Sequence, residues 1–409
     1  MEQREKIIPR AKFSLYYVLF GGVIAVLGAV LNWGLYIEGI FDLPVLLIVI
    51  GIIFAVYGFV RWLQSSNSGE EVIISRKTAK EFLTNNAIML SLMVLVVVIM
   101  FIEPRFMQID VVLDIMTMSS TRLIIALGIC FTLLIAGTDL SAGRMVGLAG
   151  VIATSMLQTA TYGNRFYPNL PALPVIVPII LAIVVCLFFG TINGFLVAKF
   201  DMHPFIATLA VQVIVYGACS LYFDLPPNNS QPIGGVRPDF AAIGQTKILT
   251  FPGFSGISVL VPIAVIICLI IWFVLNKTVF GKNVYAIGGN REAAVVSGVN
   301  VFATIMGIFI LASGLYGFAG VLESARTAGA TNQYGNGYEL DAIAACVVGG
   351  VSLNGGIGKI GGIISGVLIF TVIQYGLQFI NVSPMWQQII KGIIIAVAVA
   401  IDLSKYKRK

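Results

Sequence analysis

Residues 276–300 read NKTVFGKNVYAIGGNREAAVVSGVN and form the longest polar, basic interruption in the second half of a mostly apolar chain. The basic residues of this stretch predict a cytoplasmic location, because cytoplasmic loops of membrane proteins carry an excess of lysine and arginine. Asn290, followed by Arg-Glu-Ala-Ala, predicts an N-cap that opens a short helix, with Glu292 favourably placed in its first turn. The stretch therefore separates membrane helices and holds a short helix of its own.

Two small residues indicate a contact surface on this short helix. Ala294 and Gly298 lie four positions apart, so a helix places both on one face that is almost bare of side chains. Another protein can approach the backbone closely across such a face, which favours a docking site for a soluble partner. The alternative is an ordinary cytoplasmic connector whose glycines form turns.

The composition identifies the class of protein. Of the 409 residues, 58% are hydrophobic and 11% are charged, and the mean hydropathy is +0.97. No soluble domain of this length can bury so much apolar surface, so the sequence predicts an all-α polytopic membrane protein. The net charge of +6 comes from loops and tails and does not require a nucleic-acid partner.

The chain is expected to divide into three parts. Residues 1–63 form a transmembrane hairpin of two helices, at about 14–31 and 44–63, whose apolar runs carry no polar group. An anchoring or accessory role suits such a hairpin. A polar cytoplasmic linker, residues 64–86, joins it to a transmembrane core, residues 87–409.

The core contains about ten apolar segments, which we interpret as membrane crossings. A helix needs about 20 residues to span a bilayer, and shorter broken helices are tolerated where protein covers them. The segments are residues 87–102, 113–136, 143–158, 174–198, 205–222, 257–275, 301–322, 340–350, 356–379 and 386–403.

The positive charges support a topology in which both termini are cytoplasmic. Most of the 25 lysines and arginines fall on cytoplasmic segments in this topology. Arg122 and Arg326 are assigned to outer segments, and Lys391 to the interior of a helix. The core is therefore expected to be almost free of buried charge, unlike carriers whose coupling groups lie inside the bilayer.

Two glycine-rich turns interrupt the apolar core. Residues 137–143 (GTDLSAG) and 350–356 (GVSLNGG) share a pattern at a separation of 213 positions, which indicates a pseudo-repeat or a chance match in a glycine-rich chain. Non-helical backbone at membrane depth persists only where protein or a water-filled cavity covers it. The turns therefore mark broken helices beside a translocation path, or else ordinary cytoplasmic hairpins in which Asp139 pairs with Arg144. The residues assigned to the path or its gate are Asp139, Ser141, Asn193, Phe205, Thr208, Ser352 and Asn354.

No motif predicts catalysis or metal binding in this chain. His203 is the single histidine, and the five cysteines show no metal-ligand spacing, so no catalytic residue and no metal site are predicted. The pattern G-x-x-x-x-G-K-S/T of nucleotide-binding loops does not occur, so an ATP-driven process requires a partner. A polar stretch at residues 323–341 is expected outside the membrane, as an entrance for a sugar, a landing surface for a binding protein or a solvated loop.

Several long motifs carry a resemblance to a known family. From about residue 87 to its end, the chain resembles the permease subunit of the ribose/galactose class of bacterial ABC importers. The extra N-terminal hairpin departs from that family. The matching stretches are GTDLSAGRMVGLAG (137–150), HPFIATL (203–209), the loop 281–301, YELDAIAACVVGGVSLNGGIG (338–358) and WQQIIKGIII (386–395).

The resemblance implies partners and a cargo. It implies a permease homodimer in the bacterial cytoplasmic (inner) membrane, an ABC ATPase subunit that uses ATP and Mg²⁺, and a sugar-binding protein outside the membrane. This chain would bind no cofactor and no nucleic acid. Galactose or a methyl-galactoside is favoured as cargo; ribose, another monosaccharide or a nucleoside are alternatives, and an ion-coupled secondary transporter is a further one. The residues implied in ATPase coupling are Asn290, Arg291, Glu292, Ala293, Ala294 and Gly298.

Overall fold

A computed structural model describes most of the chain from residue 102 onward, together with a few short pieces before it. The predicted hairpin helices, most of the linker and most of segment 87–102 lie outside the described residues. Two compact units are present, Met1–Val112 with Gly376–Asn381 and Leu113–Tyr375 with Val382–Lys409. The described residues are 6–9, 19, 22, 23, 71–74, 99, 102–251 and 254–406.

The first unit contains a strand pair that the sequence did not predict. Strand β1 (Lys6–Pro9) pairs antiparallel with β2 (Glu71–Ile74). Because β1 precedes the predicted hairpin and β2 follows it, this pairing brings the two flanks of the hairpin together. In the same unit, a 3-10 helix, η1 (Pro104–Met107), carries Phe106, whose ring meets Phe379 edge-to-face at 5.6 Å between centroids.

The second unit is built from helices. The described residues contain six helices that are long and apolar enough to cross a membrane, so the chain is an all-helical polytopic membrane protein. These six are α5 (Ile109–Leu134), α7 (Ile176–Phe200), α8 (Pro204–Phe223), α10 (Leu260–Lys277), α13 (Val301–Thr327) and α15 (Ile360–Phe379). The other helices are α6 (Ala142–Met156), α9 (Pro238–Gln245), α11 (Val279–Gly289), α12 (Arg291–Val296), α14 (Tyr338–Val348) and α16 (Pro384–Tyr406). Two short strands, β3 (Lys247–Ile248) and β4 (Ile257–Ser258), pair antiparallel.

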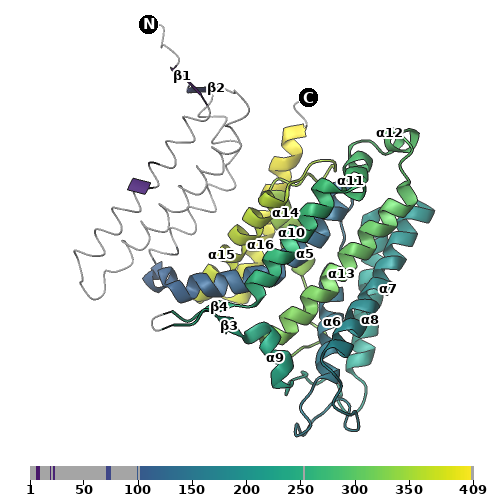
Figure 1. Ribbon diagram of the computed structural model, residues 1–409, viewed down its shortest axis with the longest axis vertical. Helices are drawn as coiled ribbons and strands as arrows, with labels where there is room; N and C mark the ends of the chain where they lie inside the picture. Colours follow the sequence, from purple (N-terminus) through teal and green to yellow (C-terminus); the bar gives the residue numbers. More distant parts are fainter. Residues whose placement is uncertain are drawn as a thin grey trace. The chain divides into compact units, whose positions relative to one another are not determined.

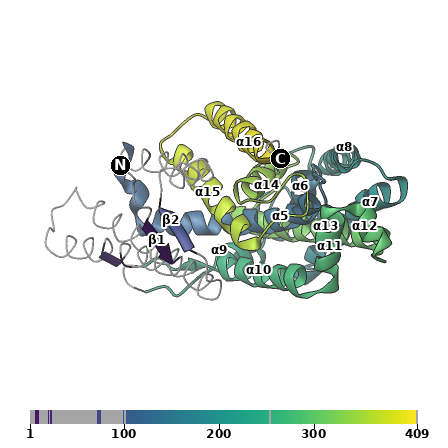
Figure 2. The ribbon, with the colours of Figure 1, turned by 90° about the horizontal axis from the view of Figure 1, so that it is seen from above.

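Helix α13 lies at the centre of one group of helices and packs along α6 and α7, which also contact α8 (Figures 1 and 2). Close approach depends on small residues: Gly190 of α7 lies against Ser313, and Gly320 of α13 lies against the backbone of Val146. Helix α8 begins at Pro204, whose fixed φ suits the first helical turn. These contacts set the spacing of the helices around the polar residues described below.

The two ends of this unit differ in the elements they carry. Figure 1 shows α11 and α12 at one end of the helices and α9 at the opposite end. Helices α11 and α12 come from the basic stretch, and α9 comes from the long predicted outer loop. The basic stretch and this loop therefore lie at opposite ends of the helices, as the predicted topology requires.

Candidate functional site

The basic stretch folds into two helices, α11 and α12. The side-chain oxygen of Asn290 accepts a hydrogen bond from the backbone N–H of Ala293 at 2.9 Å, so the predicted N-cap is confirmed. Thr278 begins α11 in a similar way and accepts from the N–H of Gly281 at 3.2 Å. Glu292 is exposed in the first turn of α12.

The prediction that α12 exposes a bare face formed by Ala294 and Gly298 is wrong. Ala294 is only 3% exposed, because α12 turns this side chain toward the protein. Gly298 lies beyond the end of the helix, with φ 81°. Its N–H donates to the carbonyl of Val295, and the N–H of Val299 donates to the carbonyl of Ala294. This is the pattern of a glycine C-cap. The apolar surface that α12 does expose consists of Val295, 57% exposed, and Val296, 89% exposed.

An ion pair joins α12 to the turn between α7 and α8. The Arg291 guanidinium contacts the carboxylate of Asp201, which ends α7 in the left-handed conformation. The predicted coupling loop is therefore connected directly to two membrane helices.

Helix α11 lies against the end of α5 and against the second glycine-rich turn. Gly288 contacts the carbonyl of Leu134, at the end of α5, and the backbone nitrogen of Gly356. The N–H of Gly356 donates to the same Leu134 carbonyl at 2.8 Å. The Tyr285 hydroxyl donates to the carbonyl of Gly358 at 2.8 Å. The end of α5, which leads into the first turn, and the second turn thus meet at α11; the pseudo-repeat itself stays a prediction.

Four of the residues assigned to the translocation path form one buried network. Asp139 accepts hydrogen bonds from the backbone N–H of Ser141 at 2.9 Å and from its hydroxyl at 2.6 Å. Asn193 of α7 donates to the Ser141 hydroxyl at 2.9 Å. Thr208 of α8 donates to the carbonyl of Thr138 at 3.2 Å. The network ties the break before α6 to α7 and α8.

The remaining residues of that set lie elsewhere. Phe205 is 45% exposed, so its ring is directed away from the network. Ser352 accepts a hydrogen bond from the N–H of Asn354 at 3.2 Å, within the second turn. Arg144 donates to the Asn336 side chain at 3.0 Å rather than to Asp139, so the alternative of a local ion pair is wrong.

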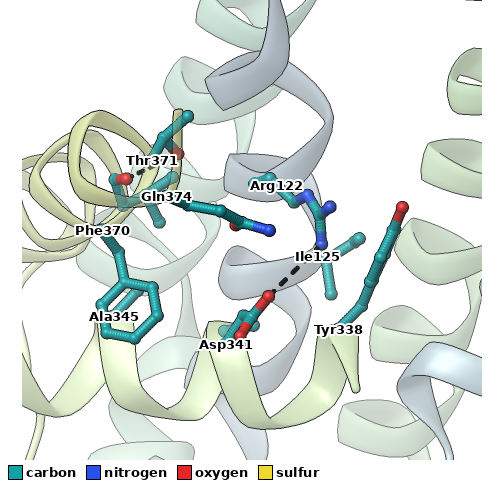
Figure 3. Close-up of a pocket in the computed structure, with 10 residues that line it drawn as sticks. Arg122, Ile125, Tyr338, Asp341, Ala345, Phe370, Thr371 and Gln374 are labelled. Carbon is teal, nitrogen blue, oxygen red and sulfur yellow. Dashed lines mark hydrogen bonds and ion pairs between the residues drawn. The ribbon is translucent and has the colours of Figure 1, made fainter. Parts of the chain in front are cut away.

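The expectation of a core almost free of buried charge is wrong. Arg122 lies near the middle of α5 rather than in an outer segment, and its guanidinium lies 3.7 Å from the Asp341 carboxylate of α14 (Figure 3). Lys391 of α16 reaches the same carboxylate at 2.8 Å. This buried cluster could have been predicted from an arginine and a lysine inside predicted membrane spans, since charged residues are rare there and usually functional.

Another buried carboxylate lies near the C-terminal end of α13. Glu323 is 1% exposed and accepts a hydrogen bond from Thr121 of α5 at 2.7 Å. Arg326, one helical turn further, donates to it at 2.8 Å. This carboxylate is therefore paired by one residue of α5 and by one residue of its own helix.

The polar stretch 323–341 does not form a solvated outer loop. The Tyr334 backbone lies against Gly147 of α6. Asn332 donates to Ser220 of α8 at 3.2 Å, and Gln333 donates to Tyr216 at 2.8 Å. This non-helical backbone packs on α6 and α8 and leads into the short helix α14.

The predicted outer loop carries one strongly coupled surface pair. The Arg237 guanidinium hydrogen-bonds the Asp239 carboxylate and holds the pKa of that carboxyl below its usual range. Arg237 also donates to the carbonyl of Leu173 at 2.6 Å, which joins α9 to the preceding outer segment.

Comparison with known proteins places these features in a family context. Residues 111–399 match the family described as branched-chain amino acid transport system / permease component. The galactose/methyl galactoside import permease protein MglC of Haemophilus influenzae is 46% identical over 336 residues, and that of Escherichia coli 44%; each alignment covers 82% of this chain and 99% of the relative. The ribose import permease protein RbsC of Bacillus subtilis is 34% identical over 77% of this chain and 92% of its own. No solved structure matches the chain significantly.

Proposed function

Since the chain belongs to the branched-chain amino acid transport system / permease component family, we propose that it imports galactose or a methyl galactoside across the bacterial cytoplasmic membrane. The observation that carries this proposal is the near full-length similarity to galactoside permeases, at higher identity than to the ribose permease. Ribose is the second candidate, because ribose permeases also align with most of the chain.

The proposed energy source is an ABC ATPase subunit that binds ATP and Mg²⁺ and contacts α12. The exposed Val295 and Val296 support this assignment, because an apolar tip on a polar, basic loop suits a pocket on a soluble partner. In this arrangement Ala294 stabilises the base of α12, and Gly298 ends the helix. The ATPase then supplies the chemistry, and this chain remains a transport subunit without a catalytic site.

A mechanical route leads from α12 to the broken helices. Movement of α12 is transmitted through the Arg291–Asp201 pair to α7 and α8. Movement of α11 is transmitted at Gly288, where the end of α5 and the second glycine-rich turn lie. Because packed elements of this kind switch between discrete arrangements, a small displacement there opens the path on one side and closes it on the other.

The remaining partners follow from the same assembly. We expect a second copy of the permease, a sugar-binding protein on the face that carries α9, and cytoplasmic termini. The buried network around Asp139 and Thr208 then stabilises the helix break beside the path, with Ser141 and Asn193 as its other members.

Transport by the reconstituted importer tests this function. The permease is placed in proteoliposomes with its ATPase and binding protein, and uptake of labelled galactose and ribose is measured with and without ATP. We expect ATP-dependent galactose uptake that exceeds ribose uptake. Uptake of ribose alone would select the second candidate, and uptake driven by an ion gradient without the ATPase would contradict the importer.

A substitution at the tip of α12 tests the docking surface. Val296→Asp places a charge on a side chain that is 89% exposed, so folding should be unaffected. We expect both the amount of co-purified ATPase and the rate of ATP-dependent uptake to fall at least tenfold. Val279→Asp, on another exposed valine of α11, is the matched control. Unchanged co-purification of the Val296 variant would show that the ATPase binds elsewhere.

A further inference from the structure

A pocket lies between α5, α14 and α15, and no function has so far been assigned to it. The empty space between its lining residues is about 290 Å³, a figure that includes open solvent, and the enclosed part is narrow. Figure 3 shows polar side chains from all three helices around this space, with the apolar side chains of Ile125 and Phe370 among them. The polar residues are Arg122, Tyr338, Asp341, Thr371 and Gln374.

The pocket has unused hydrogen-bonding capacity. The Nε and Nη1 atoms of Arg122 are buried and donate no hydrogen bond within the described residues. The Gln374 side chain extends toward the space between Arg122 and Asp341 (Figure 3). Buried donors without acceptors are costly, so a ligand that supplies acceptors at this place would be stabilised.

The charges of the pocket disfavour a cation, because Arg122 and Lys391 outnumber the Asp341 carboxylate that they share. An anionic group is attracted by the net positive charge but cannot donate a hydrogen bond to that carboxylate. An uncharged molecule with several hydroxyls can use both kinds of group, because each hydroxyl can accept from a guanidinium and donate to a carboxylate. The walls formed by Ile125 and Phe370 suit the C–H faces of such a molecule.

The position of the pocket fits a transported ligand. Arg122 lies near the middle of α5, a helix long enough to span the membrane, and Asp341 lies in the first turn of α14. Helix α14 is short and is preceded by the non-helical backbone that packs on α6. In transporters, substrate sites are commonly formed where helices are interrupted near the bilayer midplane.

We propose that this pocket is a monosaccharide subsite on the translocation path, in which Arg122, Asp341 and Gln374 bind the sugar hydroxyls. This inference rests on the proposed import of a sugar. Its interior is narrow in this structure, so the flexible side chains of Arg122 and Gln374 must move aside for a sugar to enter. The site is therefore in a closed state, in which Lys391 and Arg122 hold the carboxylate that a sugar would contact.

Direct binding of sugar to the full-length permease tests the subsite. Saturation-transfer NMR is measured on the chain in nanodiscs with methyl β-D-galactoside and with the charged sugar D-galacturonate. We expect transfer to the galactoside and at least fivefold less to the galacturonate. Gln374→Leu replaces the amide with an apolar side chain, and Ala345→Leu fills the pocket; each should reduce the galactoside signal at least fivefold. Gln378→Leu is the matched control, on an exposed residue of the same helix, and should leave the signal unchanged.

The outcomes separate this inference from the proposed function. A galactoside signal that is absent, or that persists in both the Gln374 and the Ala345 variants, overturns the subsite. Equal transfer to D-galacturonate overturns the assignment to an uncharged ligand. The proposed function is decided independently by uptake in the complete importer with the wild-type permease. Normal galactose uptake together with a signal independent of Gln374 would retain the function and reject the subsite.

Discussion

Two ion pairs of this protein show how burial changes the role of the same chemical groups. Arg291 and Asp201 pair beside α12 with side chains that are 46% and 73% exposed. Lys391 and Asp341 pair within the helices with side chains that are 26% and 10% exposed. Water and salt screen the first pair, so it contributes little free energy, whereas loss of one partner of the second leaves a charge with little solvent. The exposed pair is suited to movement and the buried cluster to a defined site.

The largest effect should follow removal of the buried carboxylate. Asp341→Ala leaves Arg122 and Lys391 without their shared partner, and breaking a buried pair in this way typically costs about 3–5 kcal/mol. We expect a markedly lower midpoint of thermal unfolding in detergent. A midpoint equal to that of the wild type would remove the distinction between the two pairs.

A smaller effect is expected where α11 meets the end of α5 and the second glycine-rich turn. In Gly288→Ala the added methyl group meets the carbonyl of Leu134 and the nitrogen of Gly356, which are backbone atoms and cannot move aside easily. Overpacking of this kind costs about 1–3 kcal/mol, and we expect both thermal stability and uptake to fall. Gly289→Ala is the control, because a methyl group there meets nothing within 4 Å. Equal behaviour of the two variants would show that this contact does not transmit movement.

Loss of the α12 cap should have a local effect. Asn290→Ala removes the acceptor for the Ala293 N–H and should cost the helix about 1 kcal/mol. We expect faster hydrogen exchange of the α12 amides and reduced coupling of ATP hydrolysis to uptake. Asn300→Ala removes a cap of the same geometry from α13 and should leave exchange in α12 unchanged. Unaltered exchange in the Asn290 variant would contradict the role of this cap.

The smallest effect on stability is expected at the exposed pair. Arg291→Ala should change the free energy of unfolding by no more than about 1 kcal/mol, and this small difference should vanish at high salt. Unfolding measured at low and high salt checks both statements. A loss as large as that of Asp341→Ala would show that exposure is a poor guide to the two pairs.

Local sequence patterns predicted several elements well. The segments predicted at 143–158 and 340–350 correspond to α6 (Ala142–Met156) and α14 (Tyr338–Val348), because hydropathy and turn residues act on neighbours in the chain. The cap at Asn290 was predictable for the same reason. The burial of Ala294 was not, because it depends on the surface against which α12 packs.

The candidate site was only partly predictable. The turn containing Asp139 and Ser141 was recognised from its interruption of apolar sequence, and the structure joins it to Asn193 and Thr208. Arg122 was assigned to the wrong depth, because the positive-inside rule counts charges in loops and does not locate a charge that is paired within a helix.

The sequence by itself determined the class of the protein, the approximate positions of its apolar helices and the short capped helix in the basic loop. These features depend on composition and on residues a few positions apart. Only the tertiary structure decided that Arg122, Asp341 and Lys391 meet in one buried cluster and that α11 lies against the end of α5 and the second glycine-rich turn. Such contacts join distant parts of the chain, and whether a charge can remain buried depends on the partners that folding brings to it.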